Sequence, residues 1–168
     1  YNNVYALDAK TGAALWHYEH QMPSDLRFCC GPTNRGVGIS GDKVFMATLD
    51  AQLIALDRAT GKVVWKVKMD DYTQGHSATG APLVLMDLVI VGNAGGEYGT
   101  RGFIDAYEVA TGKRKWRRYT IPVAGEKGVE TWAGDSWKTG GGPAWATGTY
   151  DVKTGLLFWP TGNPSPDW

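Results

Sequence analysis

The two cysteines of the chain, Cys29 and Cys30, are adjacent in the stretch "LRFCCGPTNRG", residues 26–36. Neighbouring thiols have three uses: two reduced core thiols, a two-sulfur corner of a metal site, or a disulfide between consecutive residues. The disulfide is unusual, since bridged cysteines typically lie ~4.4–6.8 Å apart at Cα and consecutive residues lie ~3.8 Å apart. It would form a stiff, sulfur-rich surface against a planar ligand, with Arg35 nearby to bind an anion.

A glycine-rich turn with one carboxylate follows a strand-like apolar run. The run "LVIVG" leads into "NAGGEYG", residues 93–99, which contains Glu97. Glycines let backbone N–H groups approach an anionic ligand closely. Because no G-x-G-x-x-G precedes a helix and no Gly-Lys-Ser/Thr follows, the turn is neither a dinucleotide-binding nor a phosphate-binding loop. A long hairpin loop with an exposed glutamate is the alternative interpretation.

Two further stretches carry groups suited to ligand binding. In "PTGNPSP", Asn163 has the position of a turn residue, but its carbonyl oxygen could also ligate a hard cation together with Glu97. In "GGGPAW", we expect Trp145 at the start of a strand, where it offers a flat face on which a conjugated ring can stack. For Trp132 and Trp137 we expect packing within the long loop that contains them.

Histidine spacing and net charge argue against several classes of function. The histidines, His17, His20 and His76, show no metal-binding spacing with the cysteines, and no Ser-His-Asp arrangement is legible. Zinc-site and hydrolase interpretations are therefore poor. The 17 basic residues balance 17 acidic ones, which gives no argument for nucleic acid or an anionic membrane surface. No apolar run approaches the ~20 residues of a membrane span.

An internal repeat indicates the scaffold that positions these residues. Four copies of one pattern, "ALDAKTGAALW", "ALDRATGKVVW", "AYEVATGKRKW" and "TYDVKTGLLFW", carry Thr-Gly and then a tryptophan. Alternating apolar residues predict a strand, the Thr-Gly step predicts a turn, and the β-rich run after it predicts a second strand. The repeated tryptophans are Trp16, Trp65, Trp116 and Trp159.

Each hairpin is preceded by further strand-like runs, such as "DKVFMAT" and "DLVIVGN". Four strands in about 40–50 residues are typical of a propeller blade, with the tryptophan packed between neighbouring blades. We therefore predict an all-β chain that forms about three to four blades of a larger ring. A stack of hairpins in a β-sandwich is the alternative. Because the sequence opens inside a repeat unit, we expect residues 1–168 to be one partial domain, truncated at both ends.

These motifs together resemble the pyrroloquinoline quinone (PQQ)-dependent alcohol dehydrogenases, the quinoproteins that include methanol and ethanol dehydrogenases. The resemblance covers the whole chain and implies an eight-bladed propeller with tryptophan-docking motifs. It also implies PQQ and a cation, Ca²⁺ or a lanthanide, as cofactors. The stretches that carry it, besides the tryptophan repeat, are "CCGPTNRG", "TGAPLV", "VGNAGGEYGTRGF", "GGGPAW" and "PTGNPSP".

The resemblance implies cofactor-binding roles for particular residues. Cys29 and Cys30 would form a disulfide over one face of the quinone, and Trp145 would stack on the other face. Arg35 would bind a cofactor carboxylate, and Thr79 would hydrogen-bond the cofactor.

The resemblance also implies how the cofactor edge and the cation are bound. The backbone of Ala94, Gly95 and Gly96 would line the edge of the quinone. Relatives often have serine where this chain has Ala94, so a side-chain bond there is lost or replaced. Glu97 and Asn163 would ligate the cation.

The activity implied is oxidation of a primary alcohol to an aldehyde, with hydride passing to a metal-polarised quinone. The family's catalytic base is an aspartate beyond the asparagine ligand, and Asp167 follows Asn163 too closely for that role. We therefore assign no catalytic residue here and expect the fragment alone to be inactive. A cytochrome c-type acceptor and a periplasmic location are also implied. The alternatives are a non-catalytic scaffold, similar to the outer-membrane assembly lipoprotein, and a sugar dehydrogenase with the same cofactor.

Overall fold

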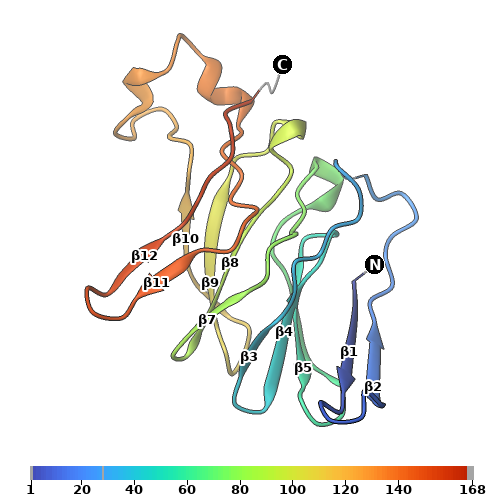
Figure 1. Ribbon diagram of the computed structural model, residues 1–168. Coiled ribbons are helices and arrows are strands. Elements are labelled where there is room, and N and C mark those ends of the chain that lie inside the picture. Colours follow the sequence, from blue (N-terminus) through green and yellow to red (C-terminus); the bar gives the residue numbers. More distant parts are fainter. Residues whose placement is uncertain (1, 28, 166–168) are drawn as a thin grey trace.

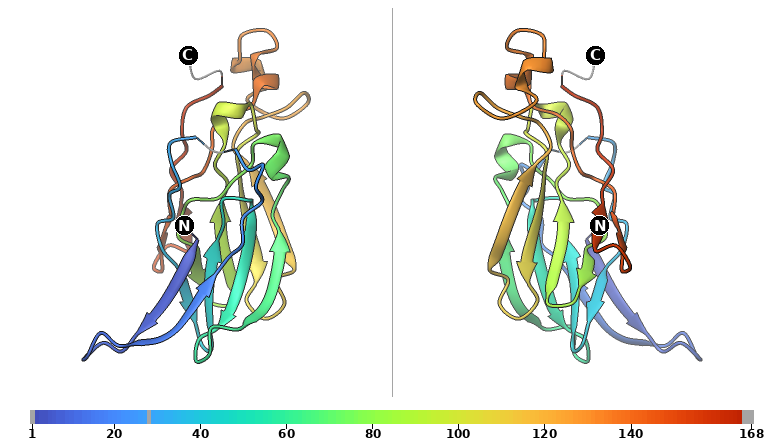
Figure 2. Two further views of the ribbon diagram at one scale, coloured as in Figure 1. Left: turned by 90° about the vertical axis from the view of Figure 1, so that its right-hand side faces the viewer. Right: turned by 90° about the vertical axis from the view of Figure 1, so that its left-hand side faces the viewer.

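The computed structural model describes residues 2–27 and 29–165, and within them the chain is built from antiparallel sheets (Figures 1 and 2). Two sheets have four strands and two have two strands. One complete sheet contains β3 (Gly38–Ser40), β4 (Lys43–Ala47), β5 (Gln52–Asp57) and β6 (Val63–Lys68). The other contains β7 (Leu83–Leu85), β8 (Leu88–Gly92), β9 (Phe103–Glu108) and β10 (Arg114–Tyr119). The two-stranded sheets are β1 (Asn3–Leu7) with β2 (Ala14–Glu19), and β11 (Thr149–Asp151) with β12 (Leu156–Phe158).

The sheets follow one another in chain order, and their strands are hydrogen-bonded in sequence order within each sheet. Figure 1 shows the hairpin turns at the lower end and the short 3₁₀ helices at the upper end. The helices are η1 (Tyr72–Gln74), η2 (Gly96–Tyr98), η3 (Val129–Thr131) and η4 (Ser136–Thr139). This arrangement confirms the prediction of a partial β-propeller over the sandwich alternative. None of the helices in the described ranges has the length and apolar character needed to cross a bilayer.

The Thr-Gly turns close through the acidic residue that precedes them. In the β5–β6 hairpin, one carboxylate oxygen of Asp57 accepts hydrogen bonds from the Thr60 hydroxyl at 2.6 Å and the Thr60 N–H at 2.8 Å. Both bonds lower the pKa of Asp57, and the bond from the Thr60 hydroxyl has the larger effect. Gly61 has φ +72°, a conformation that glycine adopts without a steric penalty. The predicted turn chemistry is therefore present.

Tryptophan docking joins neighbouring sheets at these turns. The Trp65 indole N–H donates to the Val109 carbonyl at 3.1 Å, and a Cβ at Gly112 would lie 2.7 Å from the Trp65 ring. Trp16 makes the same bond to the Arg58 carbonyl at 2.9 Å. Each ring covers the glycine of the next turn, so a side chain at that glycine would push the sheets apart.

The last two repeat tryptophans depart from this pattern. Trp116 is 38% exposed and, within the described part of the chain, makes no bond to the following turn. Trp159 donates its indole N–H to the Ala144 carbonyl at 3.1 Å instead. The β11–β12 hairpin lacks the other strands of a complete sheet and follows the long segment 120–148. Its turn does not contact the Trp116 ring, since a Cβ at Gly155 would have only the Tyr150 hydroxyl oxygen near it, at 4.0 Å.

A shared core and an ion cluster hold the two complete sheets together. The core contains buried apolar residues of β4, β5, β8 and β9, among them Phe45, Ala55, Val91 and Phe103. Arg117 donates to both oxygens of fully buried Asp105 at 2.7 Å and to Asp70, beyond β6, at 2.6 Å. Burial opposes ionisation of Asp70, but the hydrogen bond from Arg117 prevails and the pKa of Asp70 is lowered.

We predict that Trp65→Ala destabilises the protein by about 3 kcal/mol, because it empties the space between two sheets and removes a hydrogen bond. Trp116→Ala, compared in the same 168-residue chain, is the control and should cost under about 1 kcal/mol there, because within this chain its ring is more exposed and undocked. Guanidinium unfolding of both variants measures the difference. Equal losses of stability would contradict the docking account.

Candidate functional site

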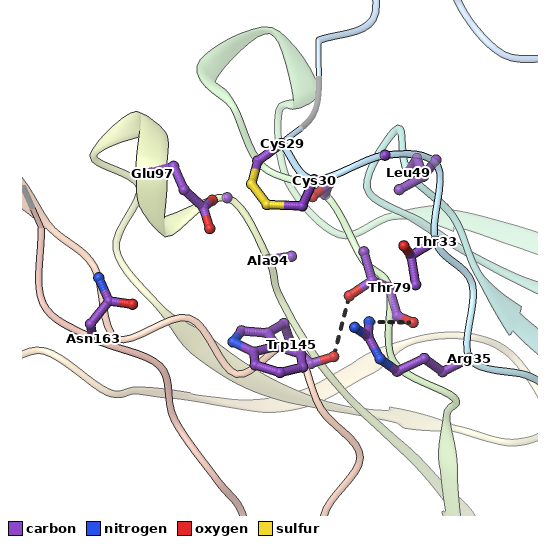
Figure 3. Close-up of a pocket in the computed structure, with 13 residues that line it drawn as sticks. Cys29, Cys30, Thr33, Arg35, Leu49, Thr79, Ala94, Glu97, Trp145 and Asn163 are labelled. Atoms are coloured by element: carbon purple, nitrogen blue, oxygen red, sulfur yellow. Dashed lines mark hydrogen bonds between the residues drawn. A yellow bond between two sulfur atoms is a disulfide. The ribbon is translucent and has the colours of Figure 1, made fainter. Parts of the chain in front are cut away.

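A cavity of about 280 Å³ brings together nearly all the residues that the sequence singled out (Figure 3). Its walls come from segments that are far apart in sequence. The residue predicted for the site but absent from the lining is Gly96, where a Cβ would meet the Pro143 ring at 2.7 Å. The lining residues are Cys29, Cys30, Gly31, Thr33, Arg35, Leu49, Ser77, Thr79, Ala94, Gly95, Glu97, Trp145 and Asn163.

Both cysteines of the sequence are joined to each other in a disulfide, with a Cα–Cα distance of 3.8 Å. This is the third of the uses named above for adjacent cysteines. Cys30 has φ +67° and Gly31 has φ +83°, so the backbone has the left-handed conformation at the second cysteine and at the residue that follows it. Figure 3 shows the disulfide on one side of the cavity and Trp145 on the other. The two groups form opposite walls.

Close backbone packing fixes the Trp145 wall. The Thr79 hydroxyl donates to the Trp145 carbonyl at 3.3 Å. A Cβ at Gly80 would lie 3.0 Å from that same carbonyl oxygen, and one at Gly92 would overlap the Ala144 carbonyl. The chain before Trp145 thus lies directly against the strand segments of the preceding sheet. Its ring remains 42% exposed and available for stacking.

Arg35 reaches the cavity from the disulfide loop. Its backbone N–H and its guanidinium both donate to the Thr79 carbonyl, at 3.0 and 3.4 Å. The guanidinium carbon also lies 4.7 Å from the centroid of the Trp145 ring, a cation–π contact. The loop is therefore tied to the opposite wall while Arg35 keeps further donors for an anion. The predicted bond from Thr79 to a cofactor stays a prediction, since its hydroxyl proton faces the Trp145 carbonyl here.

A buried polar network next to the cavity wall had no sequence signal. His20 and Asp50 are 5% and 2% exposed, and the His20 ring nitrogen lies 2.9 and 3.0 Å from the two Asp50 oxygens. Burial opposes ionisation of Asp50, but hydrogen bonds from His20 and the Thr48 hydroxyl prevail and lower its pKa. The Thr48 carbonyl accepts the Ala78 N–H at 3.0 Å, which links this network to the cavity wall.

Asn34 was also missed, and it anchors the disulfide loop. Its side-chain amide donates to the Ala47 carbonyl at 2.9 Å, and its side-chain oxygen accepts the Gly36 N–H at 2.9 Å. The loop is thereby fixed to the end of β4. The "TNRG" stretch contains a typical turn residue at this position, which is the signal that could have indicated it.

Glu97 and Asn163, the residues predicted to bind a cation, lie on the side of the cavity between the disulfide wall and the Trp145 wall. One Glu97 carboxylate oxygen and the sulfurs of Cys29 and Cys30 lie within 4.8 Å of one another. Bonded sulfurs are not thiolates, so the carboxylate is the ligand for a hard cation in this group. The Asn163 side-chain amide donates to the Pro164 carbonyl at 3.1 Å, and Figure 3 shows its oxygen toward the cavity.

Comparison with known proteins gives matches that cover nearly all of this chain. The family model described as "PQQ: Glucose/ethanol/alcohol dehydrogenase, beta-propeller domain" matches residues 1–168. The quinoprotein alcohol dehydrogenase PedH of Pseudomonas putida is 42% identical over 99% of this chain and 31% of its own length. The lanthanide-dependent methanol dehydrogenase of Methylacidiphilum fumariolicum is 42% identical over 97% of this chain and 30% of its own length.

Solved structures agree with these matches. A europium-containing methanol dehydrogenase superposes with a TM-score of 0.88 at 40% identity, over 96% of this chain and 32% of that one. BamB from Moraxella catarrhalis has a TM-score of 0.57 at 24% identity, over 95% of this chain and 37% of that one, which indicates a shared fold alone. The chain spans about a third of the length of the curated relatives that it matches.

The disulfide predicts a specific pattern of thiol labelling. In the denatured but unreduced protein, an alkylating reagent should leave Cys29 and Cys30 unmodified, and after reduction it should modify both. Mass spectrometry of the peptide that contains the pair measures this directly. Alkylation of both residues without a reductant would show that the bond is absent.

Proposed function

This chain belongs to the family of the PQQ glucose/ethanol/alcohol dehydrogenase β-propeller domain, and on that premise we propose that it forms the cofactor-binding part of a PQQ-dependent alcohol dehydrogenase. The enzyme oxidises a primary alcohol to an aldehyde. The observation that carries the proposal is the cavity in which a disulfide, an indole, a guanidinium and a carboxylate meet. These groups come from distant segments and have no common purpose in packing alone.

The cavity fits a flat, anionic, conjugated ring. Trp145 offers a partly exposed aromatic face, and the Cys29–Cys30 disulfide lies on the opposite side. Arg35 is held by Thr79 with guanidinium donors left for a carboxylate, as in charge-assisted recognition of anions. In this proposal the chain's own residues bind the cofactor, fix its plane and keep its faces away from water.

The oxygen donors fit a hard cation. Glu97 supplies a carboxylate and Asn163 an amide oxygen on the same cavity, a donor set that suits Ca²⁺ or a lanthanide better than a soft metal. When bound, the quinone and its cation supply a polarised carbonyl that accepts hydride from the alcohol. Glu97 and Asn163 hold the cation at the cavity, and no residue of this chain is assigned as the base. Asp167 lies outside the described residues.

The proposal also covers the rest of the propeller, the electron acceptor and the cellular compartment. Because the matched relatives are about three times longer, the chain acts as one segment of a longer propeller, with the base on another segment. We propose a cytochrome c-type electron acceptor and a periplasmic location. A structural disulfide supports this compartment, since such bonds persist in oxidising surroundings. A non-catalytic scaffold would need none of the groups that line the cavity.

Reconstitution of the full-length protein tests the activity. With PQQ and either Ca²⁺ or a lanthanide, it should reduce an artificial dye in the presence of short primary alcohols, and removal of either cofactor should abolish the reaction. Glucose serves as the control substrate and should give little activity. Dye reduction that is unchanged without PQQ, or that occurs with glucose alone, would contradict the proposal.

The cation site is tested by Glu97→Gln. Loss of the carboxylate charge should weaken binding of Ca²⁺ or a lanthanide by at least about tenfold, because hard cations depend on anionic oxygen ligands. Direct titration with Eu³⁺, followed by its luminescence, measures the affinity. Glu130→Gln, exposed in η3 and outside the cavity, is the matched control. An unchanged Eu³⁺ affinity in the Glu97 variant would remove this residue from the site.

A further inference from the structure

Ser77 lies in the cavity wall, and its hydroxyl has no hydrogen-bond partner among residues 2–27 and 29–165. Ser77 is 5% exposed and lines the cavity. Its backbone N–H and carbonyl are both used in bonds to Ala94, at 3.2 and 2.7 Å. Within the described part of the chain, no group hydrogen-bonds the Ser77 side chain. A hydroxyl in a residue this deeply buried, with no protein partner, is available to a polar group of a ligand in the cavity.

The orientation of the strand segment directs this hydroxyl into the cavity. Side chains of an extended segment alternate between its two faces. Ala78 is fully buried, while Ser77 and Thr79 both line the cavity. Every completely buried side-chain nitrogen or oxygen in the described ranges has a hydrogen-bond partner. The Ser77 oxygen has no such partner, so it is not completely buried. Because Ser77 lines the cavity, its oxygen is accessible from the cavity.

Ser77 and Ala94 form a cross-strand pair. They face each other in an antiparallel bridge and exchange both backbone hydrogen bonds. In such a pair the Cα atoms lie about 5.5 Å apart and the side chains lie on the same face. The Ala94 methyl also lines the cavity. This part of the wall thus carries one hydroxyl, on the Ser77 side, next to a methyl that cannot hydrogen-bond.

We propose that Ser77 is a further cofactor-binding residue, whose hydroxyl donates to a carboxylate or carbonyl oxygen at the edge of the planar quinone. The inference rests on the proposed function, because it assumes a flat anionic quinone in this cavity. Ala94 has no side-chain donor, and the Ser77 hydroxyl provides one next to it, from the strand segment that pairs with Ala94. Thr79 on the same face directs its own proton to the Trp145 carbonyl.

The test measures PQQ affinity in the full-length protein by quenching of tryptophan fluorescence, at saturating cation. Ser77→Ala should raise the Kd about tenfold, the effect of one hydrogen bond to a charged or strongly polar acceptor. The double variant Ser77→Ala/Ala94→Ser returns a hydroxyl to the same face from the neighbouring strand and should recover most of the affinity. Ser40→Ala, at the end of β3 and outside the cavity, is the matched control and should bind like the parent.

The outcomes separate this inference from the proposed function. If the parent protein fails to bind PQQ, both are overturned. If the parent binds and Ser77→Ala binds equally well, the role of Ser77 is overturned while the proposed function stands. A double variant as weak as Ser77→Ala also contradicts the cross-strand argument. Unfolding midpoints of all variants show whether a change in affinity reflects a loss of folded protein.

Discussion

The site depends on backbone segments that approach one another too closely for side chains to fit between them. Glycines in the strand segments of the second complete sheet make this possible. A Cβ at Gly92 would overlap the Ala144 carbonyl, and one at Gly102 would overlap the Gly142 carbonyl. The segment leading to Trp145 therefore lies directly on β8 and β9, and the position of the indole follows from contacts between main chains. Such contacts leave little freedom, which suits a wall that must face a rigid ring.

The opposite wall is held by polar groups. Asn34 bonds the end of β4, and Arg35 crosses to the Thr79 carbonyl. Asn2 connects the loop to the buried His20–Asp50 pair, because its carbonyl accepts the His20 N–H at 3.2 Å and its side-chain oxygen accepts the Asn34 amide at 3.3 Å. The disulfide adds stiffness within the loop itself. Because these bonds reach two different sheets, the spacing of the cavity walls is coupled to the way neighbouring sheets pack. The docking of Trp65 joins the same two sheets near their hairpin turns, and it thus contributes to the geometry of the site from a distance.

The sequence predicted what is local and repeated, and it missed what depends on long-range geometry. The Thr-Gly turns, the hairpins and the first docked tryptophans follow from short patterns. Unusual stretches such as the adjacent cysteines located the cavity. The His20–Asp50 pair and the Ser77 hydroxyl have no such pattern, because their meaning arises from contacts between residues distant in sequence. Trp116 has the repeat pattern but does not dock on a turn within the described residues, so the pattern alone does not decide which tryptophans pack between sheets.

A crystal structure of the full-length protein with PQQ and Ca²⁺ or a lanthanide is the most direct measurement of the central claim. The account predicts difference density for a flat ring between the Cys29–Cys30 disulfide and the Trp145 indole. It also predicts density for a cation that is coordinated by a Glu97 oxygen. Cofactor density elsewhere in the protein, with the disulfide and the indole in contact with each other or with protein side chains, would contradict it.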